Sequence, residues 1–102
     1  MLRSHSAMSG WVYILASWPR GTLYIGVTND LVRRVHEHHE GIADGFSNEH
    51  DVKQLVYYEE HATMPLALQR EKNIKHWSRK WKIGLIVSMN PEWIDLWDDM
   101  TR

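Results

Sequence analysis

Apolar, aromatic and β-branched residues gather in three short runs, a pattern that predicts three strands. The first run, Trp11 to Ser17, and the second, Thr22 to Val27, are separated by Trp18-Pro19-Arg20-Gly21. Proline and glycine at such a junction favour a tight turn, so the two runs should form a hairpin. The third predicted strand covers Gln54 to His61.

Between and after these runs the apolar residues recur with the period of a helix. One helix is expected from Asp30 to Gly41, capped by Thr28 or Asn29, with a loop from Ile42 to Lys53 after it. A second helix should begin after its cap Thr63 and run to about Ser78.

A third helix is expected from Trp81 to Met89, and a last short helical turn between Pro91 and Trp97. The order β-β-α-β-α-α predicts a small α/β domain of the α+β kind, with helices flanking a three-stranded, mostly antiparallel sheet. We expect one domain over residues 11–97, after a disordered leader at 1–10 and before a tail at 98–102.

Composition and charge narrow the class of protein. The chain has no cysteine, which excludes disulfides and fits a cytoplasmic protein, and no apolar run is long enough to cross a bilayer. The net charge is −1, but Arg70 to Lys82 holds six basic residues and one acid, while Glu92 to Asp99 holds four acids and no base. The basic segment suits either a solvated helix face or a phosphate backbone.

Candidate chemistry begins in the hairpin. If its turn has four residues, Ser17 pairs with Thr22, and Tyr13 faces Gly26. Tyr24 then lies on the same face of the sheet as Tyr13 and diagonal to it. Gly26 should leave open space beside the two phenols, where a substrate can approach the backbone. The alternative is a pair of core tyrosines with satisfied hydroxyls.

Two helices carry polar residues on faces that are otherwise apolar. His38 continues the stripe of Leu31 and Val35, and Arg34 borders that stripe. On the second helix, Ala67, Glu71, Ile74 and Ser78 share one face, which Glu71 interrupts.

Each of these polar residues also has a structural interpretation. His38 can be a core histidine, Arg34 can bury only its stem, and Glu71 can form an ion pair, for example with Arg34. Two phenols, a guanidinium, an imidazole and a carboxylate on one side of a sheet, however, match the needs of phosphodiester hydrolysis.

In their order along the chain, these residues resemble the signature of the GIY-YIG nucleases. Val12-Tyr13-Ile14 and Tyr24-Ile25-Gly26 are similar to the two triplets, and Thr28-x-Asp30-Leu31-x-x-Arg34-x-x-x-His38 is similar to the helix that follows them. Arg70-Glu71-Lys72 resembles the segment with the metal-binding glutamate.

The closing segments, Trp81-Lys82-Ile83 and Asn90-Pro91-x-Trp93-x-Asp95-Leu96, resemble small, stand-alone bacterial members of the family. The resemblance covers roughly Trp11 to Trp97. There are two departures: Val12 replaces the glycine of the first triplet, and Val27 stands where some members have a lysine.

The resemblance implies a metal-dependent endonuclease. Glu71 would hold one Mg²⁺ or Mn²⁺ ion, and Arg34 would contact the scissile phosphate. Tyr13, Tyr24 and His38 would position and deprotonate the attacking water, with the choice among the three left open.

The expected substrate is nucleic acid, namely DNA, with branched, nicked or damaged structures as targets in DNA repair. Gly26, Lys72, Lys75 and Arg79 are the candidate substrate-binding residues, and the last three are spaced along one helix face to track a backbone. No membrane is expected as a partner. Tryptophans at 93 and 97 would pack onto the domain or onto a second copy, which predicts a monomer or a weak homodimer.

Two other functions remain open at this point. A binding module of the same fold, with weak or no hydrolysis, would suit the near-neutral charge and Val27. A metal site on His36, His38, His39 and Glu40 is the third hypothesis, although His38 should point away from the other three.

Overall fold

The computed structural model describes residues 9–18, 21–42 and 51–101, and its core is a three-stranded antiparallel sheet in the order β2-β1-β3. The strands are β1 (Gly10–Ala16), β2 (Leu23–Thr28) and β3 (Gln54–His61). The expected fold class and the order of elements are therefore confirmed. Of the expected disordered leader, residues 1–8 lie outside the described residues, as do residues 43–50 of the expected loop.

Strand β1 lies in the centre of the sheet because its residues are apolar on both faces. From Val12 to Ala16 every residue is 0–1% exposed. Side chains that alternate along a strand divide the core in two. Tyr13 and Leu15 lie in one cluster with the apolar side of the first helix, and Val12 and Ile14 lie in the other with the next two helices.

The hairpin has the expected register. Tyr13 pairs with Gly26 and Leu15 with Tyr24, and the Ser17 amide donates to the Thr22 carbonyl at 3.1 Å. Because one register shift moves every side chain to the other face, this pairing decides which residues share the surface with Tyr13.

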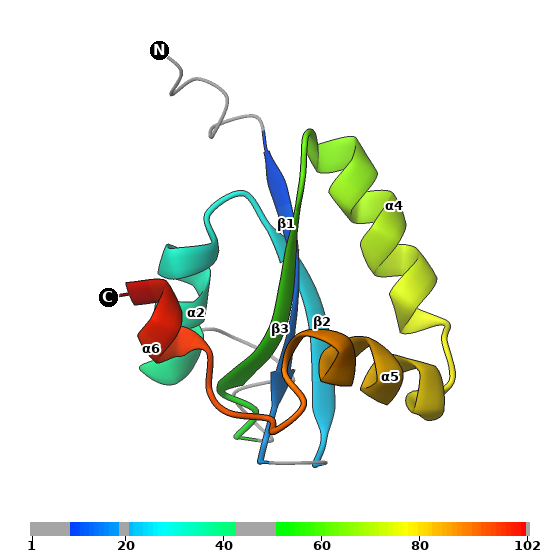
Figure 1. The fold of residues 1–102 in the computed structure, drawn as a ribbon. Helices are drawn as coiled ribbons and strands as arrows, with labels where there is room; N and C mark the ends of the chain where they lie inside the picture. Colours follow the sequence, from blue (N-terminus) through cyan, green and yellow to red (C-terminus); the bar gives the residue numbers. More distant parts are fainter. Residues whose placement is uncertain (1–8, 19–20, 43–50, 102) are drawn as a thin grey trace.

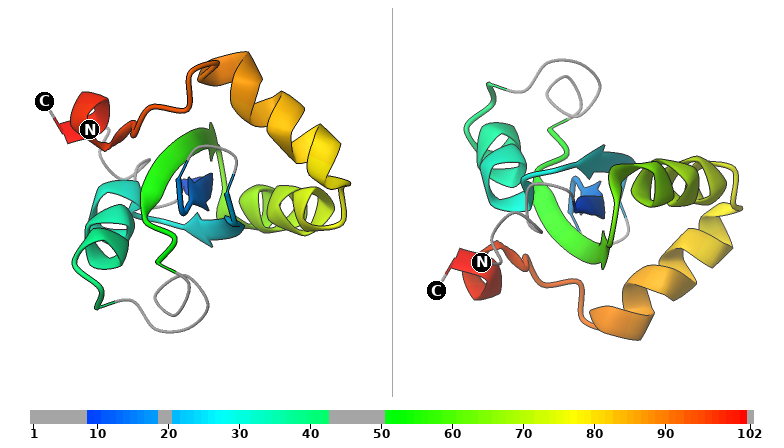
Figure 2. Two further views of the ribbon diagram at one scale, coloured as in Figure 1. Left: turned by 90° about the horizontal axis from the view of Figure 1, so that it is seen from below. Right: turned by 90° about the horizontal axis from the view of Figure 1, so that it is seen from above.

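Helices cover both faces of the sheet (Figures 1 and 2). Helix α2 (Leu31–His39) and the short C-terminal α6 (Trp97–Thr101) lie on the Tyr13 side, while α4 (Met64–Lys75) and α5 (Arg79–Met89) lie on the other. No helix of the described residues is long and apolar enough to cross a membrane.

The caps explain two differences from the expected helices. Asp30, rather than Thr28 or Asn29, caps α2, because its side chain accepts from the Arg33 amide. Helix α4 is capped by Thr63 as expected but ends at Lys75, three residues early, since Ser78 instead caps α5 by accepting from the Trp81 amide.

The last helical turn is displaced toward the C-terminus. It was expected between Pro91 and Trp97, but α6 begins at Trp97. The Asn90 side chain bonds both the amide and the carbonyl of Ile94, and Trp93 between them has a positive φ of 57°. Asp95 Oδ1 accepts from the Trp97 amide, which fixes where α6 begins.

Candidate active site

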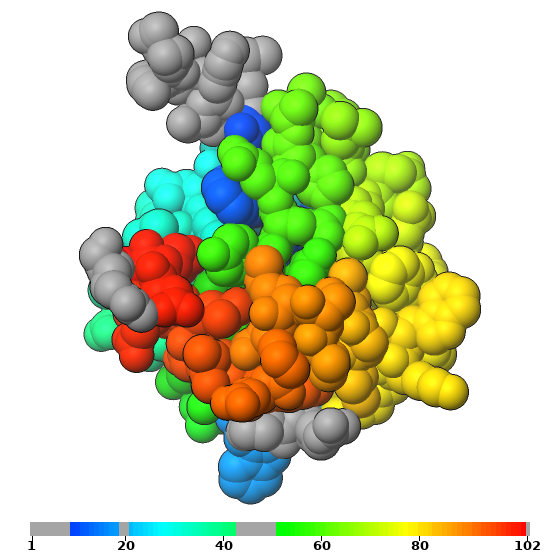
Figure 3. Space-filling view, in the orientation of Figure 1, coloured from blue at the N-terminus to red at the C-terminus, as the bar shows by residue number. Residues whose placement is uncertain are grey.

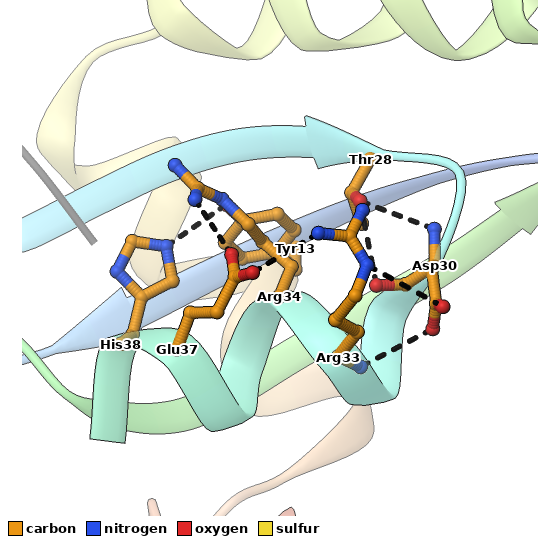
Figure 4. Close-up of polar contacts among 7 residues, drawn as sticks. All are labelled: Tyr13, Thr28, Asp30, Arg33, Arg34, Glu37 and His38. Carbon is orange, nitrogen blue, oxygen red and sulfur yellow. Dashed lines mark hydrogen bonds and ion pairs between the residues drawn. The ribbon is translucent and has the colours of Figure 1, made fainter. Parts of the chain in front are cut away.

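Two phenols and an imidazole meet on the α2 side of the sheet. The Tyr13 hydroxyl lies 3.2 Å from His38 Nε2, as Figure 4 shows. The ring of Tyr24 is 6.3 Å from that of Tyr13 and 5.5 Å from that of His38, measured between centroids. Residues from β1, β2 and α2 thus form one aromatic cluster, with the diagonal placement of the phenols that the hairpin register predicts.

The members of this cluster differ in access to solvent. Tyr13 is 1% exposed and His38 2%, whereas Tyr24 is only partly buried. Burial, followed by the proximity of Tyr24, raises the pKa of Tyr13 to about 12. Burial, followed by the positive charge of Arg34, lowers the pKa of His38 to about 4. At neutral pH, Tyr13 is therefore protonated and His38 is neutral, and the His38 tautomer decides which of the two donates this hydrogen bond.

Gly26 leaves the space that the Tyr13 ring occupies. A Cβ at residue 26 would overlap the hydroxyl and Cζ of Tyr13 and come within 2.9 Å of its Cε1. The expectation of open space for a substrate beside Gly26 is thus wrong, because the phenol ring itself fills that space. The glycine acts on the site through the position of Tyr13.

Arg34 lies at the edge of the same cluster and is held by Glu37, a residue that the sequence analysis missed. Arg34 Nη1 donates to Glu37 Oε1 at 3.0 Å, and Arg33 Nη1 donates to Glu37 Oε2 at 3.0 Å (Figure 4). Burial disfavours the charge of Arg34 more than any single contact favours it, but the hydrogen bonds to Glu37 and Tyr13 together outweigh burial, so the pKa of Arg34 is raised. The spacing of one helical turn between Arg34 and Glu37 was the signal available in the sequence.

Glu71 lies on another helix and pairs with Lys75, not with Arg34. Its Oε2 is 2.8 Å from Lys75 Nζ, and the Glu71 side chain is only 14% exposed. The interpretation of Glu71 as an ion-pair partner of Arg34 is therefore wrong, because each has its own partner within its own helix.

The orientation of α4 turns Glu71 toward β2, the strand of Tyr24. Arg70 reaches β3, where its Nε donates to Glu59 at 2.9 Å. Glu71, one residue later, is about 100° further round the helix, on the other side of the buried line through Ala67 and Ile74. Since α4 packs chiefly on β1 and β2, this side faces β2. Because α4 lies on the face of the sheet opposite to α2 and the phenols, the expectation that all five side chains share one side of the sheet is wrong. That the Glu71 carboxylate meets the phenols around the edge strand β2 stays a prediction.

The chemistry of the donors fits a hard divalent cation at Glu71. Within the described residues, no group of three histidine or carboxylate side chains gathers to form a complete cage. Mg²⁺ seldom needs one, because it is commonly bound by one or two carboxylates, with waters and substrate phosphates as its other ligands. A largely buried carboxylate that is paired with a lysine suits that arrangement.

The three basic residues expected to follow a nucleic-acid backbone, Lys72, Lys75 and Arg79, do not share one helix face. Lys72 is exposed near the end of α4, and Lys75 is bound to Glu71. Arg79 belongs to α5, and its Nη2 donates to the Gly21 carbonyl at 2.7 Å, which ties this helix to the hairpin turn. The prediction that Lys72, Lys75 and Arg79 share one helix face is wrong, because α4 ends at Lys75.

The histidines near the end of α2 also have structural contacts. The His36 ring stacks on Trp97 at 6.2 Å between centroids, and His39 Nε2 lies 3.3 Å from Asp95 Oδ2. His38 points into the core instead. In the part of the chain that the structure describes, these residues form no metal cluster, so the third hypothesis gains no support.

A groove of about 740 Å³ opens beside the start of α2, away from this cluster. Trp11 and Tyr58 line it together with the carboxylates Asp30 and Glu60. None of the five candidate catalytic residues is among its lining residues. Arg33 also lines this groove but is already paired with Asp30 and Glu37, so the carboxylates would repel a phosphate and the groove is a poor substrate site.

Comparison with known proteins places these observations in a family context. A family model described as the GIY-YIG catalytic domain matches residues 9–84. The chain is 38% identical over 72 residues to a UPF0213 protein of Bacillus pumilus, covering 71% of this chain and 74% of the relative. It is 34% identical over 79 residues to a UPF0213 protein of Pseudomonas aeruginosa, covering 78% and 76%.

A solved structure agrees with the same assignment. The solution NMR structure of a UPF0213 protein from Bacillus halodurans superimposes with a TM-score of 0.55 at 27% identity. The match covers 86% of this chain and 93% of that one. The fold, and with it the sheet that carries both tyrosines, is therefore shared.

Proposed function

This chain belongs to the GIY-YIG catalytic-domain family, a family of nucleases, and from that premise we propose that it is a metal-dependent endonuclease that hydrolyses DNA phosphodiester bonds. The observation that carries the proposal is the cluster of Tyr13, Tyr24 and His38 with Arg34 at its edge. Branched, nicked or damaged DNA is the proposed substrate.

The proton chemistry follows from access and pKa. Tyr13 is buried and protonated, so it positions His38 through the hydrogen bond to Nε2 rather than contacting substrate. Tyr24 is the accessible phenol and orients the attacking water. His38, whose pKa is lowered to about 4, is a weak base at pH 7, so it holds Tyr13 in place, and Tyr24 is the proposed group that relays the proton of the attacking water.

Arg34 and Glu71 are the proposed ligands of the phosphate and of the metal ion. Arg34, held in place by Glu37, contacts a non-bridging oxygen of the scissile phosphate and stabilises the charge that builds in the transition state. Glu71 would hold one Mg²⁺ or Mn²⁺ ion, which when bound supplies Lewis-acid polarisation of the phosphate.

The test is a cleavage assay on labelled DNA. Wild-type protein should cut a branched or nicked duplex with Mg²⁺ or Mn²⁺ and stop when the metal is chelated. Glu71→Gln and Arg34→Ala should each lower the rate by about a hundredfold or more, while Glu92→Gln, an exposed carboxylate distant in sequence, should not.

Cleavage that persists in Glu71→Gln would overturn the metal role. If wild-type protein retains DNA in a mobility-shift assay, with or without metal, but never cuts it, the chain is instead a binding module of the same fold. The same assays with an RNA of the same sequence show whether the protein acts on DNA or on RNA.

A further inference from the structure

Helix α5 carries a groove that the proposed mechanism does not use. The groove has a volume of about 480 Å³ and is lined by Trp77, Lys80, Trp81, Gly84, Leu85 and Ser88. Helix α5 lies on the face of the sheet opposite to α2 and forms part of the front surface in Figure 3. The groove is thus separate from the cluster of Tyr13 and His38.

The shape of this groove suits a flat ring. Trp81 is 64% exposed and contacts Trp77 edge to face, at 5.9 Å between centroids and 80° between planes. The Trp77 ring has the Arg70 guanidinium 5.2 Å from its centroid. Gly84 leaves the groove open above the helix backbone, because it has no side chain and a Cβ there would meet nothing within 4 Å. The groove therefore combines an accessible indole with a bare stretch of helix backbone.

The charge around the groove suits an anion attached to that ring. Lys80 lines the groove, whereas Lys82 lies about 200° further round the same helix and belongs to another side of it. Lys72 is exposed on the preceding helix. From Arg70 to Lys82 the single acid is Glu71, which is already paired with Lys75. This part of a chain with a net charge of −1 is therefore positive.

We propose that the α5 groove binds an unpaired base of single-stranded nucleic acid, which stacks on Trp81 while Lys80 contacts its phosphate. Aromatic stacking beside basic side chains is the general means of holding single strands without sequence preference. The inference rests on the proposed function in naming nucleic acid as the partner. It adds that the preferred substrate has a single-stranded segment, as a flap or a branched junction does.

A second copy of the chain is the other occupant to consider. It would have to bury Lys80, and lysine is depleted from the centre of protein interfaces. A nucleotide instead brings its own negative charge to that ammonium group. The charge around the groove therefore favours nucleic acid.

The experiment measures binding without cleavage, in chelator, by fluorescence anisotropy. Three labelled probes are compared: a single-stranded DNA oligonucleotide, the same backbone with abasic sites, and the duplex. Wild-type protein should prefer the single strand with bases over the abasic strand. Trp81→Ala should lower single-strand affinity roughly 5- to 150-fold, the effect of losing one base stack, and abolish this preference.

Further variants separate stacking from loss of fold. Trp81→Tyr should retain most of the affinity, and Gly84→Leu, whose new side chain meets no protein atom at its Cβ, should block the groove. Trp18→Ala, at an equally exposed tryptophan in the hairpin turn, is the matched control and should bind like wild type.

Unchanged affinity in both Trp81→Ala and Gly84→Leu would overturn the proposal. Sedimentation that shows a dimer, dissociated by Gly84→Leu without loss of DNA binding, would also overturn it, because the occupant would then be a second copy. If wild-type protein prefers the strand with bases but never cleaves DNA with metal, only the proposed nuclease activity is rejected. If it cleaves DNA but shows no preference for bases over abasic sites, only the proposed role of this groove is rejected.

Discussion

Replacing Gly26 by alanine gives a sharp test of how the cluster is built. A methyl group at residue 26 would occupy the place of the Tyr13 hydroxyl and Cζ. Tyr13 is 1% exposed and packed on all sides, so its ring cannot move aside without shifting its neighbours. The substitution therefore forces one of two buried groups out of position.

The expected cost can be worked out from ordinary packing energies. Overfilling a packed core costs about 1–3 kcal/mol. Glycine in a strand is itself unfavourable by about 0.5–1 kcal/mol relative to alanine, so without the clash the substitution would stabilise the protein. Because a Cβ would overlap two atoms of a buried ring, we take the upper end of the overfilling cost, about 3 kcal/mol, which leaves a net loss of about 2 kcal/mol. With a shift of about 4–8 °C per kcal/mol for a domain of this size, Gly26→Ala should lower Tm by about 8–16 °C.

Thermal and chemical unfolding measure this effect, with Gly84→Ala as the matched control. Gly84 lies in a helix and its Cβ would meet nothing, so that variant should gain about 1 kcal/mol of stability. In the double variant Gly26→Ala/Tyr13→Ala, the loss should be smaller than the sum of the two single losses, because the clash is gone. Unchanged stability in Gly26→Ala, or strict additivity in the double variant, would refute the reasoning.

The remaining predictions concern titration and ion pairing. Because His38 has a pKa of about 4 in the folded protein and near 6.5 when unfolded, the folded state binds fewer protons between these values. The free energy of unfolding should therefore fall as pH drops from about 6.5 to about 4, by up to about 3 kcal/mol. Urea titrations at several pH values measure this dependence. His38→Gln should flatten it, and the control His36→Gln should not. Lys75→Gln removes the cation that competes with metal at Glu71, so Mn²⁺ affinity measured by electron paramagnetic resonance should rise, by less than about fivefold for so exposed a lysine; weaker Mn²⁺ binding would contradict the competition. Glu37→Gln removes the ion pairs with Arg33 and Arg34, so kcat for DNA cleavage should fall while the unfolding curve stays near that of wild type. An unchanged kcat would show that the Arg34–Glu37 pair does not act on catalysis.

Much of the fold could be predicted because local rules agree with the tertiary structure. A four-residue turn fixed the pairing of Tyr13 with Gly26, and the stripe that contains Val35 and His38 identified the buried side of α2. Strand β3 has the predicted bounds. In each case the periodicity of apolar residues and a turn or cap signal gave the same answer.

The differences arise where side chains far apart in sequence decide the outcome. The start of α6 depends on Asp95, whose carboxylate also accepts from the Leu55 amide of β3 across the fold. The filling of the space at Gly26 depends on which way the Tyr13 ring turns, which register alone does not specify. Competing caps at Asp30 and Ser78 shortened two predicted helices, because several residues near each end can serve as caps.

The most direct test of the account is the position of a bound ion. A crystal grown with Mn²⁺ and a short DNA duplex, with diffraction recorded near the manganese absorption edge, would locate the metal by its anomalous signal. We expect one peak at the Glu71 carboxylate, within reach of a phosphate oxygen that also contacts Arg34 and lies beside Tyr24. A peak elsewhere, or a Glu71 carboxylate directed away from both phenols, would contradict the claim that these residues form one nuclease site.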